Sequence, residues 1–375
     1  MYSFIASLSI FFTFFIVAFF YQKRNYLPHI DASSIEKRYY FIDGIRGIAA
    51  VCVVIGHSWR VGARWIDISD YTIEMGGFIA AIGVQVFFCI TGFLFIDQVI
   101  KRNAIFNWKK YFLARIKRLF PLFIVTTTIC VLIIYAESYK NIINISYQDI
   151  KNTIKLYTFG FFGGGVVSIN GVDSSLLTIM HWTLPFEWRF YFSLPVLCVA
   201  CRLLKTKSPV MLFLMFAVIT YFFNGMYFGK WFLTGCISAL IFNKMNLFCK
   251  TYRIIAFSVG CSLMMSLFFI NAEPYGYVNF IFVSIFFISI VISRPEILKI
   301  KTLIYIGESS YSIYLFHTIV MFTIPWLIFS FFGKMKIDNS IIALSFLSLI
   351  SMIICSLSLF TFKNIEHPFL KKKTK

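Results

Sequence analysis

Residues 41–57 read "FIDGIRGIAAVCVVIGH", an apolar stretch that carries an acid, a base and a histidine. Residues 41–59 form a run long enough to cross about 30 Å of hydrocarbon. An ionised side chain inside such a span costs roughly 2.5–3.5 kcal/mol or more. Asp43, Arg46 and His57 therefore mark this span as a functional one, because a helix that only crossed lipid would carry none of them.

The composition extends this membrane character to the whole chain. Hydrophobic residues make up 59% of the 375, Phe alone accounts for 47, and the mean hydropathy is +0.81, beyond the range of soluble globular domains. These values predict an all-α, polytopic transmembrane bundle of about ten core helices plus one extra N-terminal helix. The expected spans lie near residues 3–20, 41–59, 78–98, 119–136, 183–201, 208–224, 228–243, 254–271, 275–293, 303–331 and 340–362.

The net charge of +19 predicts the orientation of the chain. Lys and Arg gather in alternate loops, and the loop 99–118 alone holds seven of the 35. Because cytoplasmic loops carry an excess of Lys and Arg, this distribution predicts an N-terminus outside and a C-terminus in the cytoplasm. The basic excess is explained by topology, so no nucleic-acid partner is expected.

Two domains are expected. Residues 1–37 comprise a first helix, which has "QKR" after it and no base before it, the reverse of a secretory signal peptide, and a cytoplasmic linker. Residues 38–375 form the membrane domain, in which 137–181 is interpreted as a re-entrant or surface loop. The nine Cys lie mostly in apolar runs, and the Cys198/Cys201 pair has no second pair, so neither a metal site nor a disulfide framework is expected.

The polar residues of the opening stretch share one helical face. At 100° per residue, Arg46 and His57 lie about 20° apart in azimuth and roughly 16 Å apart along the axis, with Asp43 on the same side. This face is expected to line a cavity, where His57 can act as a general base. Structural alternatives are an i,i+3 ion pair that starts the helix, for Asp43 and Arg46, and an interior hydrogen bond for His57.

A second polar cluster, "HWTLPFEWRFYFSLP" at 181–195, opens a later span. Its two prolines are expected to interrupt the helix beside a cavity. A carboxylate from Glu187 within reach of His57 would orient the imidazole, with Trp182 at the outer interface. The structural alternative is an aromatic belt with a snorkelling Arg189 and an ion-paired glutamate.

A third cluster, "GESSYSIYLFH" at 307–317, is an unusually polar start to a span. Its serines can simply hydrogen-bond neighbouring helices. Tyr314 and His317 lie one turn apart, and we expect them to line a cavity and contact substrate.

The basic loop 99–118 has two interpretations. Its bases are interleaved with aromatic residues, as in an amphipathic segment at an anionic leaflet. Alternatively, Arg115 and Arg118 bind the phosphate groups of a cytoplasmic cofactor.

Taken in order, these blocks resemble the integral-membrane acyltransferase family three, the bacterial acyl-CoA-dependent O-acyltransferases of surface sugars. The resemblance covers roughly 38–370, and its most specific part is 41–57, which is similar to the family's motif of Arg, ten residues and His. The other similar blocks are "GVQVFFCITGFLF" at 83–95, "ARIKRLFP" at 114–121, "HWTLPFEWRFY" at 181–191, "GESSYSIYLFH" at 307–317 and "IEHP" at 365–368.

The resemblance implies a function. A family member has about ten core helices in the bacterial inner membrane, takes an acyl-CoA donor, acetyl-CoA above all, from the cytoplasm, and acylates a hydroxyl of a surface or lipid-linked glycan outside. Carried over by position, Arg46, Arg115 and Arg118 would hold the donor. His57 would do the chemistry, with Glu187 as a further member of the site. From the polar clusters themselves, we expect Asp43 to assist the catalysis, and Tyr314, His317 and Trp182 to contact the acceptor.

Some features depart from the family. Position 85 is Gln where many relatives have Asp, and position 91 is Thr where many have Ser, so no carboxylate role is carried over to that block. The esterase-like soluble domain fused to some relatives is missing from this sequence, and we expect the chain to act alone or with a separate partner.

The route of transfer stays open at this point. In the direct route His57 deprotonates the acceptor hydroxyl, which attacks the thioester. In the relayed route His57 takes the acyl group first and passes it outward. A different class, a transporter or flippase of a glycan or lipid precursor, would also use charges and broken helices in an interior cavity. A purely structural role would leave the phenotype intact without His57.

Overall fold

The computed structural model is helical almost throughout, and it describes residues 2–32, 38–66, 69–138, 145–162, 166–204, 208–243, 249–270, 272–332, 337 and 340–370. Within these ranges the strands are limited to the antiparallel pair β1 (Ser168–Ile169) and β2 (Val172–Asp173). The predicted all-α membrane bundle is confirmed. Several loop bases behind the orientation prediction, among them those in 205–207 and 371–375, lie outside the described residues.

The helices follow one another along the chain in this order: α1 (Tyr2–Lys23), α2 (Pro28–Ala32), α3 (Tyr40–Gly62), α4 (Asp70–Lys101), α5 (Trp108–Glu137), α6 (Tyr147–Leu156), α7 (Ser175–Thr178), η3 (Ile179–Thr183), α8 (Leu184–Leu203), α9 (Pro209–Phe242), α10 (Lys250–Ser266), η5 (Leu267–Phe269), α11 (Tyr277–Ser293), η6 (Glu296–Lys299), α12 (Lys301–Glu308), α13 (Ser310–Phe332), α14 (Ser340–Thr361), η7 (Phe362–Glu366) and α15 (His367–Leu370).

Seven helical segments of the described chain are long and apolar enough to cross a membrane, so the protein is a multi-pass membrane protein. They are Phe4–Lys23, Tyr40–Gly62, Tyr71–Lys101, Trp108–Glu137, Lys250–Phe269, Ser310–Phe331 and Ser340–Leu370. The two arms of α9 and α11 are apolar but shorter, at 10–17 residues. Helix α8 is long enough but carries Glu187, Arg189 and Arg202.

The boundary predicted between the spans 208–224 and 228–243 is present, because a φ of 67° at Gly225 breaks the helical geometry and divides α9 into two arms. The structure differs from the expected spans in two places. The span predicted at 303–331 is divided at Ser309 into α12 and α13. The expected interruption of α8 is wrong: Pro185 sits in the first turn, which tolerates proline, and the helix continues through Pro195.

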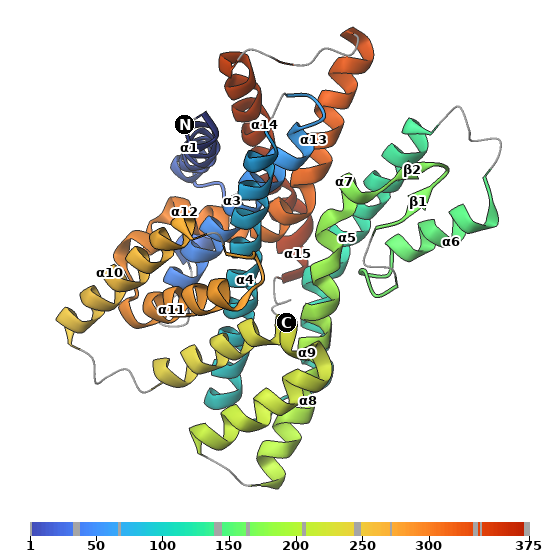
Figure 1. Cartoon of the computed structure of the whole chain (residues 1–375). Helices are drawn as coiled ribbons and strands as arrows, with labels where there is room; N and C mark the ends of the chain where they lie inside the picture. Colours follow the sequence, from blue (N-terminus) through green and yellow to red (C-terminus); the bar gives the residue numbers. More distant parts are fainter. Residues whose placement is uncertain are drawn as a thin grey trace.

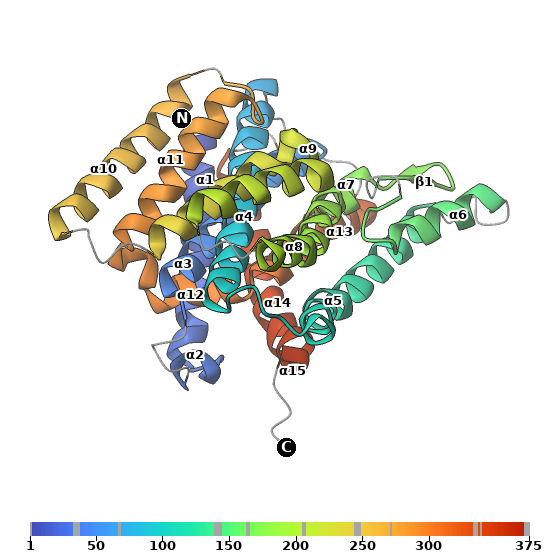
Figure 2. The same ribbon diagram turned by 90° about the horizontal axis from the view of Figure 1, so that it is seen from below.

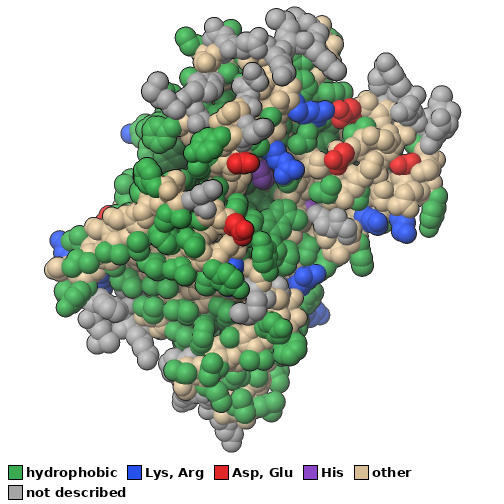
Figure 3. All heavy atoms as spheres, viewed as in Figure 1, with side chains coloured by type: hydrophobic (Ala, Val, Ile, Leu, Met, Phe, Trp, Pro, Cys, Tyr) green, Lys and Arg blue, Asp and Glu red, His purple; other side chains and the backbone are tan. Residues whose placement is uncertain are grey.

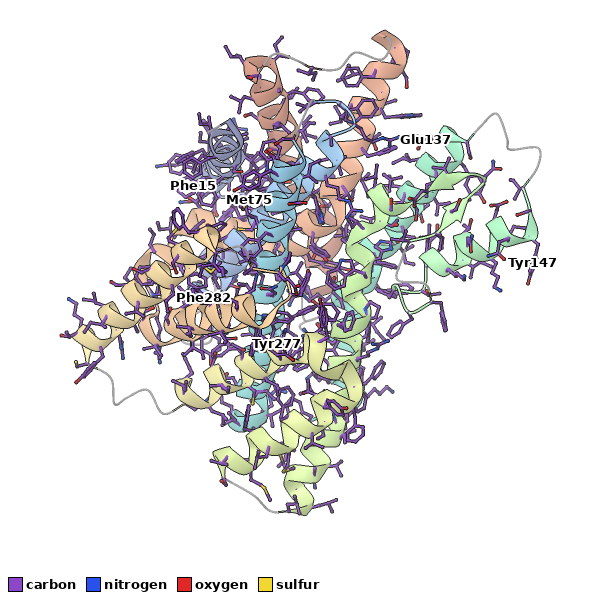
Figure 4. All side chains as sticks on the ribbon, viewed as in Figure 1. Phe15, Met75, Glu137, Tyr147, Tyr277 and Phe282 are labelled. Atoms are coloured by element: carbon purple, nitrogen blue, oxygen red, sulfur yellow. The ribbon has the colours of Figure 1, made fainter. Side chains whose placement is uncertain are left out.

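The predicted loop 137–181 also contains regular structure. Its described part holds α6, the β1–β2 hairpin and α7, and Figure 1 shows α6 and the hairpin projecting from one flank. Tyr147 on α6 is 81% exposed and points away from the helical body in Figure 4. The described part of this segment therefore stands outside the helical body and has regular structure of its own.

Helix α3, which carries the opening stretch, lies in the middle of the bundle. It packs against α4, α12 and α13, and Figures 1 and 2 show α1, α10 and α11 to one side of it, with α5 and α6 to the other. Close contact of α3 with η6 and α12 depends on glycine: a Cβ on Gly44 would collide with the Leu298 carbonyl of η6, and one on Gly307 of α12 with the Asp43 carbonyl. Small residues of this kind let membrane helices approach closely.

The outer surface of the bundle is apolar. Phe222, Phe269 and Phe331 are 78%, 87% and 83% exposed, and Figure 3 shows hydrophobic side chains over most of the face it presents. Such exposure suits contact with lipid, because a soluble protein rarely leaves so large an apolar area uncovered. The charged side chains gather instead in a few clusters, and the largest buried cluster lies along α3.

Candidate active site

A cavity of about 180 Å³ lies beside α3, between α4, α5, α8 and α13. Its polar wall unites residues from four separate blocks of the sequence. They are Arg46, Arg115, Arg118, Glu187, Tyr191, Tyr311 and Tyr314. With three arginines and one glutamate, the cavity suits an anion, and we refer to it below as the polar cavity.

Arg46 is held at the cavity wall by a buried ion network. Asp43 Oδ1 lies 3.1 Å from the Arg46 guanidinium, and this i,i+3 ion pair, the structural alternative considered from the sequence, is present. Arg38 Nε donates to the other Asp43 oxygen at 2.6 Å, and Arg38 also pairs with Glu308. His29 Nε2 lies 3.4 Å from Glu308 Oε2. Asp43 thus binds two arginines and fixes Arg46, without itself lining the polar cavity.

The same network stabilises the charge on Arg38. Burial lowers the pKa of its guanidinium, but the Glu308 and Asp43 carboxylates outweigh burial, and the pKa is raised. Arg38 and Glu308 were not among the residues singled out from the sequence. Glu308 begins a block that was noted for its hydroxyls, and Arg38 looked like one more loop base.

A second hollow of about 460 Å³ adjoins the polar cavity at Arg46. The two share Arg46, Leu94 and Gln98 in their walls. The hollow adds Arg38, Asp43, Asp97, Lys101 and Arg102. Its wall holds four basic groups and two carboxylates, so it also carries a net positive charge, and we call it the basic hollow.

Arg115 and Arg118 lie one turn apart on α5 and face the polar cavity. The Arg115 guanidinium stacks over the Phe95 ring at 5.1 Å, and its Nε is buried without a hydrogen-bond partner among the described residues. Across the cavity, Tyr191 Oη donates to Glu187 at 3.1 Å. The structure therefore brings Arg46, Arg115, Arg118 and Glu187 around one space.

His57 makes its hydrogen bond to another histidine and not to a carboxylate. Its Nδ1 lies 2.7 Å from Nε2 of His317, and the rings stack with centroids 5.0 Å apart. Nδ1 of His317 lies 3.1 Å from the Ile313 carbonyl, which only accepts. In neutral rings His317 therefore donates to Ile313 and accepts from His57, which leaves Nε2 of His57 with a free lone pair.

Tyr314 connects the polar cavity with the histidine pair. It lines the cavity, and its ring centroid is 6.1 Å from that of His317. Its hydroxyl donates to the Met180 carbonyl at 3.2 Å and lies 2.7 Å from Thr183 Oγ1. Of the two residues expected to line a cavity, Tyr314 does so, whereas His317, one helical turn on, is buried and lies outside the polar cavity wall, as does His57.

Two expected arrangements differ in the structure. The hydrogen bond of Glu187 comes from Tyr191, and Glu187 lines the Arg46 end of the site, so it does not orient His57. Trp182 packs against Phe228 and Tyr275, with ring centroids 5.2 and 6.0 Å away, and lies outside the polar cavity wall. The ring partners of Trp182 lie far away in the chain, where helical periodicity cannot pair them. The Tyr191–Glu187 hydrogen bond is instead an i,i+4 contact within α8, which helical spacing could have indicated.

The two departures from the family pattern have local partners. Gln85 Nε2 donates to the Pro274 carbonyl at 2.5 Å, and Thr91 Oγ1 donates to the Phe87 carbonyl one turn back at 3.0 Å. Thr91 also lines the polar cavity, whereas Gln85 ties α4 to the segment before α11.

Comparison with known proteins gives a consistent result. A protein named "Putative O-acetyltransferase" in Staphylococcus aureus strain COL is 25% identical over 393 residues, covering 95% of this chain and 59% of its own length. A protein of the same name in strain MSSA476 matches equally well. O-acetyltransferase OatA of strain NCTC 8325 is 26% identical over 315 residues, covering 74% of this chain and 49% of its own length.

The chain thus spans less than two thirds of the length of these relatives. No solved structure matches it. The family model described as "Acyltransferase domain" matches residues 39–361. The resemblance of the sequence blocks is confirmed, and the protein belongs to this family of acyltransferases.

Proposed function

We propose that this chain is a membrane O-acetyltransferase. In this proposal it takes the acetyl group from acetyl-CoA at the cytoplasmic side of the bacterial inner membrane and transfers it to a hydroxyl of a surface or lipid-linked glycan. The names of the relatives support O-acetyl transfer. The N-terminus is proposed to lie outside and the C-terminus in the cytoplasm, because of the loop bases.

One observation carries the proposal: polar space continues along α3, from the basic hollow past Arg46 into the polar cavity, and Tyr314 links that cavity to the histidine pair. A CoA donor carries several phosphate groups on a long neutral arm. Arg38, Lys101 and Arg102 in the basic hollow suit the phosphates, since guanidinium groups bind them in a bidentate way. Arg46 and Arg115 then suit the end of the arm within the polar cavity.

The chemistry follows from the free lone pair of His57. Nε2 of His57 takes the proton of the acceptor hydroxyl, the hydroxyl oxygen bonds to the thioester carbonyl carbon, and the carbon–sulfur bond breaks. The CoA sulfur leaves as a thiolate and recovers the proton from the imidazolium. His317 holds the ring of His57 in place during both proton transfers, as the third group of a triad orients its base.

The relayed route places the acetyl group on Nε2 of His57 before the acceptor binds. Its support is the axial separation between Arg46 and His57, which lie eleven residues or roughly 16 Å apart on α3. Both routes require the acyl end of the donor to reach past Tyr314 to His57. The two routes differ in whether a radiolabelled acetyl group stays on the protein when acceptor is withheld.

The proposal is tested with purified protein in lipid vesicles supplied with acetyl-CoA. Release of CoA thiol is followed with and without extracted surface glycan. We expect release that depends on the glycan for wild type and for Arg189→Ala, whose side chain is exposed on α8. His57→Ala should give none. Folded wild-type protein that releases no thiol from any short acyl-CoA, with any glycan fraction, would overturn the proposal.

A further inference from the structure

A second large cavity lies against a different face of α3 from the one that carries Arg46. It has a volume of about 560 Å³, and apolar side chains and cysteines line it throughout. Each surrounding helix contributes to the wall, for example through Phe15, Ile48, Ile82, Phe257, Ile290 and Leu303. Figure 4 shows Phe15 of α1 and Phe282 of α11 on the same flank of the molecule. We call this space the apolar cavity.

Water does not suit the apolar cavity, because a buried water needs two to four polar partners. An apolar cavity of about 150 Å³ already binds benzene, and this one is several times larger. Empty, its lining would forfeit dispersion contacts over its whole surface. In a bilayer the abundant apolar filler is the acyl chain of a lipid.

Two arginines mark one end of the apolar cavity. Arg253 lies one turn before Phe257 on α10, and Arg294 lies one turn after Ile290 at the end of α11. Because residues four apart share a helical face, Arg253 lies on the cavity side of α10. Arg294 has a φ of 49°, which ends α11, and the packing of α10 against α11 places it at the same end of the cavity, just outside its wall. The Arg294 guanidinium lies over the Phe242 ring, 4.2 Å from its centroid.

The two guanidiniums are close enough to repel each other. Burial lowers the pKa of Arg294, and the positive charge of Arg253 lowers it further. Nε of Arg253 is buried and has no hydrogen-bond partner within the described part of the chain. A pair of like charges beside an unsatisfied donor is stabilised by an anion between them.

Lipid can reach this site from the side. Helix α10 is the outermost helix on its flank in Figures 1 and 2, and Tyr252, Ile254 and Val259 are 62%, 57% and 48% exposed. Under the proposed orientation the arginines face the cytoplasmic leaflet, where anionic lipids attract basic side chains.

We propose that an anionic phospholipid of the bilayer binds here, with its phosphate between Arg253 and Arg294 and one acyl chain in the apolar cavity. The lipid fills the space between the α10–α11 pair and α3, and it stabilises that pair against the rest of the bundle. This site is separate from the polar cavity, and the inference stands whether or not the chain transfers acetyl groups.

The test is native mass spectrometry of the full-length protein after detergent extraction, followed by titration with phosphatidylglycerol. Wild type should retain a phospholipid. The Arg253→Gln/Arg294→Gln double variant should bind phosphatidylglycerol on the order of 30-fold more weakly. Lys250→Gln, which removes an exposed base at the same end of α10, is the matched control and should bind like wild type.

A cavity-filling variant and two control ligands complete the test. Cys261→Trp fills the apolar cavity from α10 and should weaken lipid binding with both arginines intact, even if the double variant does not fold. Phosphatidylcholine and inorganic phosphate should each raise the thermal midpoint less than phosphatidylglycerol does. Equal binding by wild type and the folded double variant, no bound lipid in wild type, or stabilisation by phosphate alone would each overturn the proposal.

Discussion

The polar cavity and the apolar cavity lie on different faces of the same helix. Arg46 of α3 lines the first, and Ile48, two residues on, lines the second. The polar cavity is the smaller, about 180 against 560 Å³, yet its wall has three arginines and a glutamate. One helix therefore separates a space suited to an anionic, reacting substrate from a space suited to an acyl chain.

The difference shows what charge inside a membrane is used for. Desolvating Arg46 is expensive, and the network of Asp43, Arg38 and Glu308 compensates for it. The apolar cavity needs no such ion network, because its side chains are as apolar as the hydrocarbon of the bilayer. If this distinction is correct, substitutions at the polar cavity should lower acetyl transfer, and substitutions at the apolar cavity should lower stability.

The largest effect is expected from His57→Ala. Loss of the general base should lower kcat for acetyl transfer by about 10²- to 10⁴-fold, measured as thiol release in vesicles. Size-exclusion chromatography and the thermal midpoint control for folding. Normal transfer by the folded variant would break the assignment of chemistry to the polar side of α3.

Arg46→Ala should have the next largest effect. It removes a charged contact to the donor, and KM for acetyl-CoA should rise roughly 10- to 100-fold, as expected for a charge-assisted hydrogen bond. Arg189→Ala on α8 is the matched control, because its side chain is exposed. An unchanged KM in the folded Arg46→Ala variant would show that the donor binds elsewhere.

His317→Ala tests whether the histidine pair orients the base. With the hydrogen bond to His57 removed, kcat should fall about 5- to 10-fold, while KM for acetyl-CoA stays at its wild-type value. His317→Gln offers an amide oxygen that can accept from His57, and it should restore part of kcat. Equal losses in both variants would point to packing and not to positioning.

Ile48→Ala should have the smallest effect on transfer and sharpens the comparison most. It shortens a side chain in the apolar cavity, and the thermal midpoint should drop by a few degrees, on the order of 1 kcal/mol. Transfer per folded molecule should stay within about twofold of wild type. A fall in kcat comparable to that of Arg46→Ala would mean that both faces of α3 serve the reaction.

Much of the fold was accessible from the sequence. The hydropathy identified the membrane bundle, and the 100° periodicity placed Asp43, Arg46 and His57 on one face of α3. Sequence patterns did not predict where helices are interrupted. Helix α8 continues through Pro195, and α12 ends before Ser309. Nothing in a hydropathy pattern distinguishes these outcomes.

The site was predicted less completely. His57 and His317 are 260 residues apart, so their hydrogen bond follows from the packing of α13 on α3 and not from any spacing. Arg38 and Lys101 were attributed to membrane orientation alone, because cytoplasmic loops are generally rich in Lys and Arg. The apolar cavity could not be predicted from the sequence, because the side chains that face an apolar cavity and those that face lipid are of the same types.

The most direct test is mass spectrometry of surface glycans from matched strains that express wild type, His57→Ala or neither, with Arg189→Ala as the control for expression. An acetyl increment on a glycan with wild type and Arg189→Ala, and with neither of the others, is the predicted result. The same increment with well-expressed His57→Ala, or none on any glycan with wild type, would contradict the assignment of acetyl transfer to the polar side of α3.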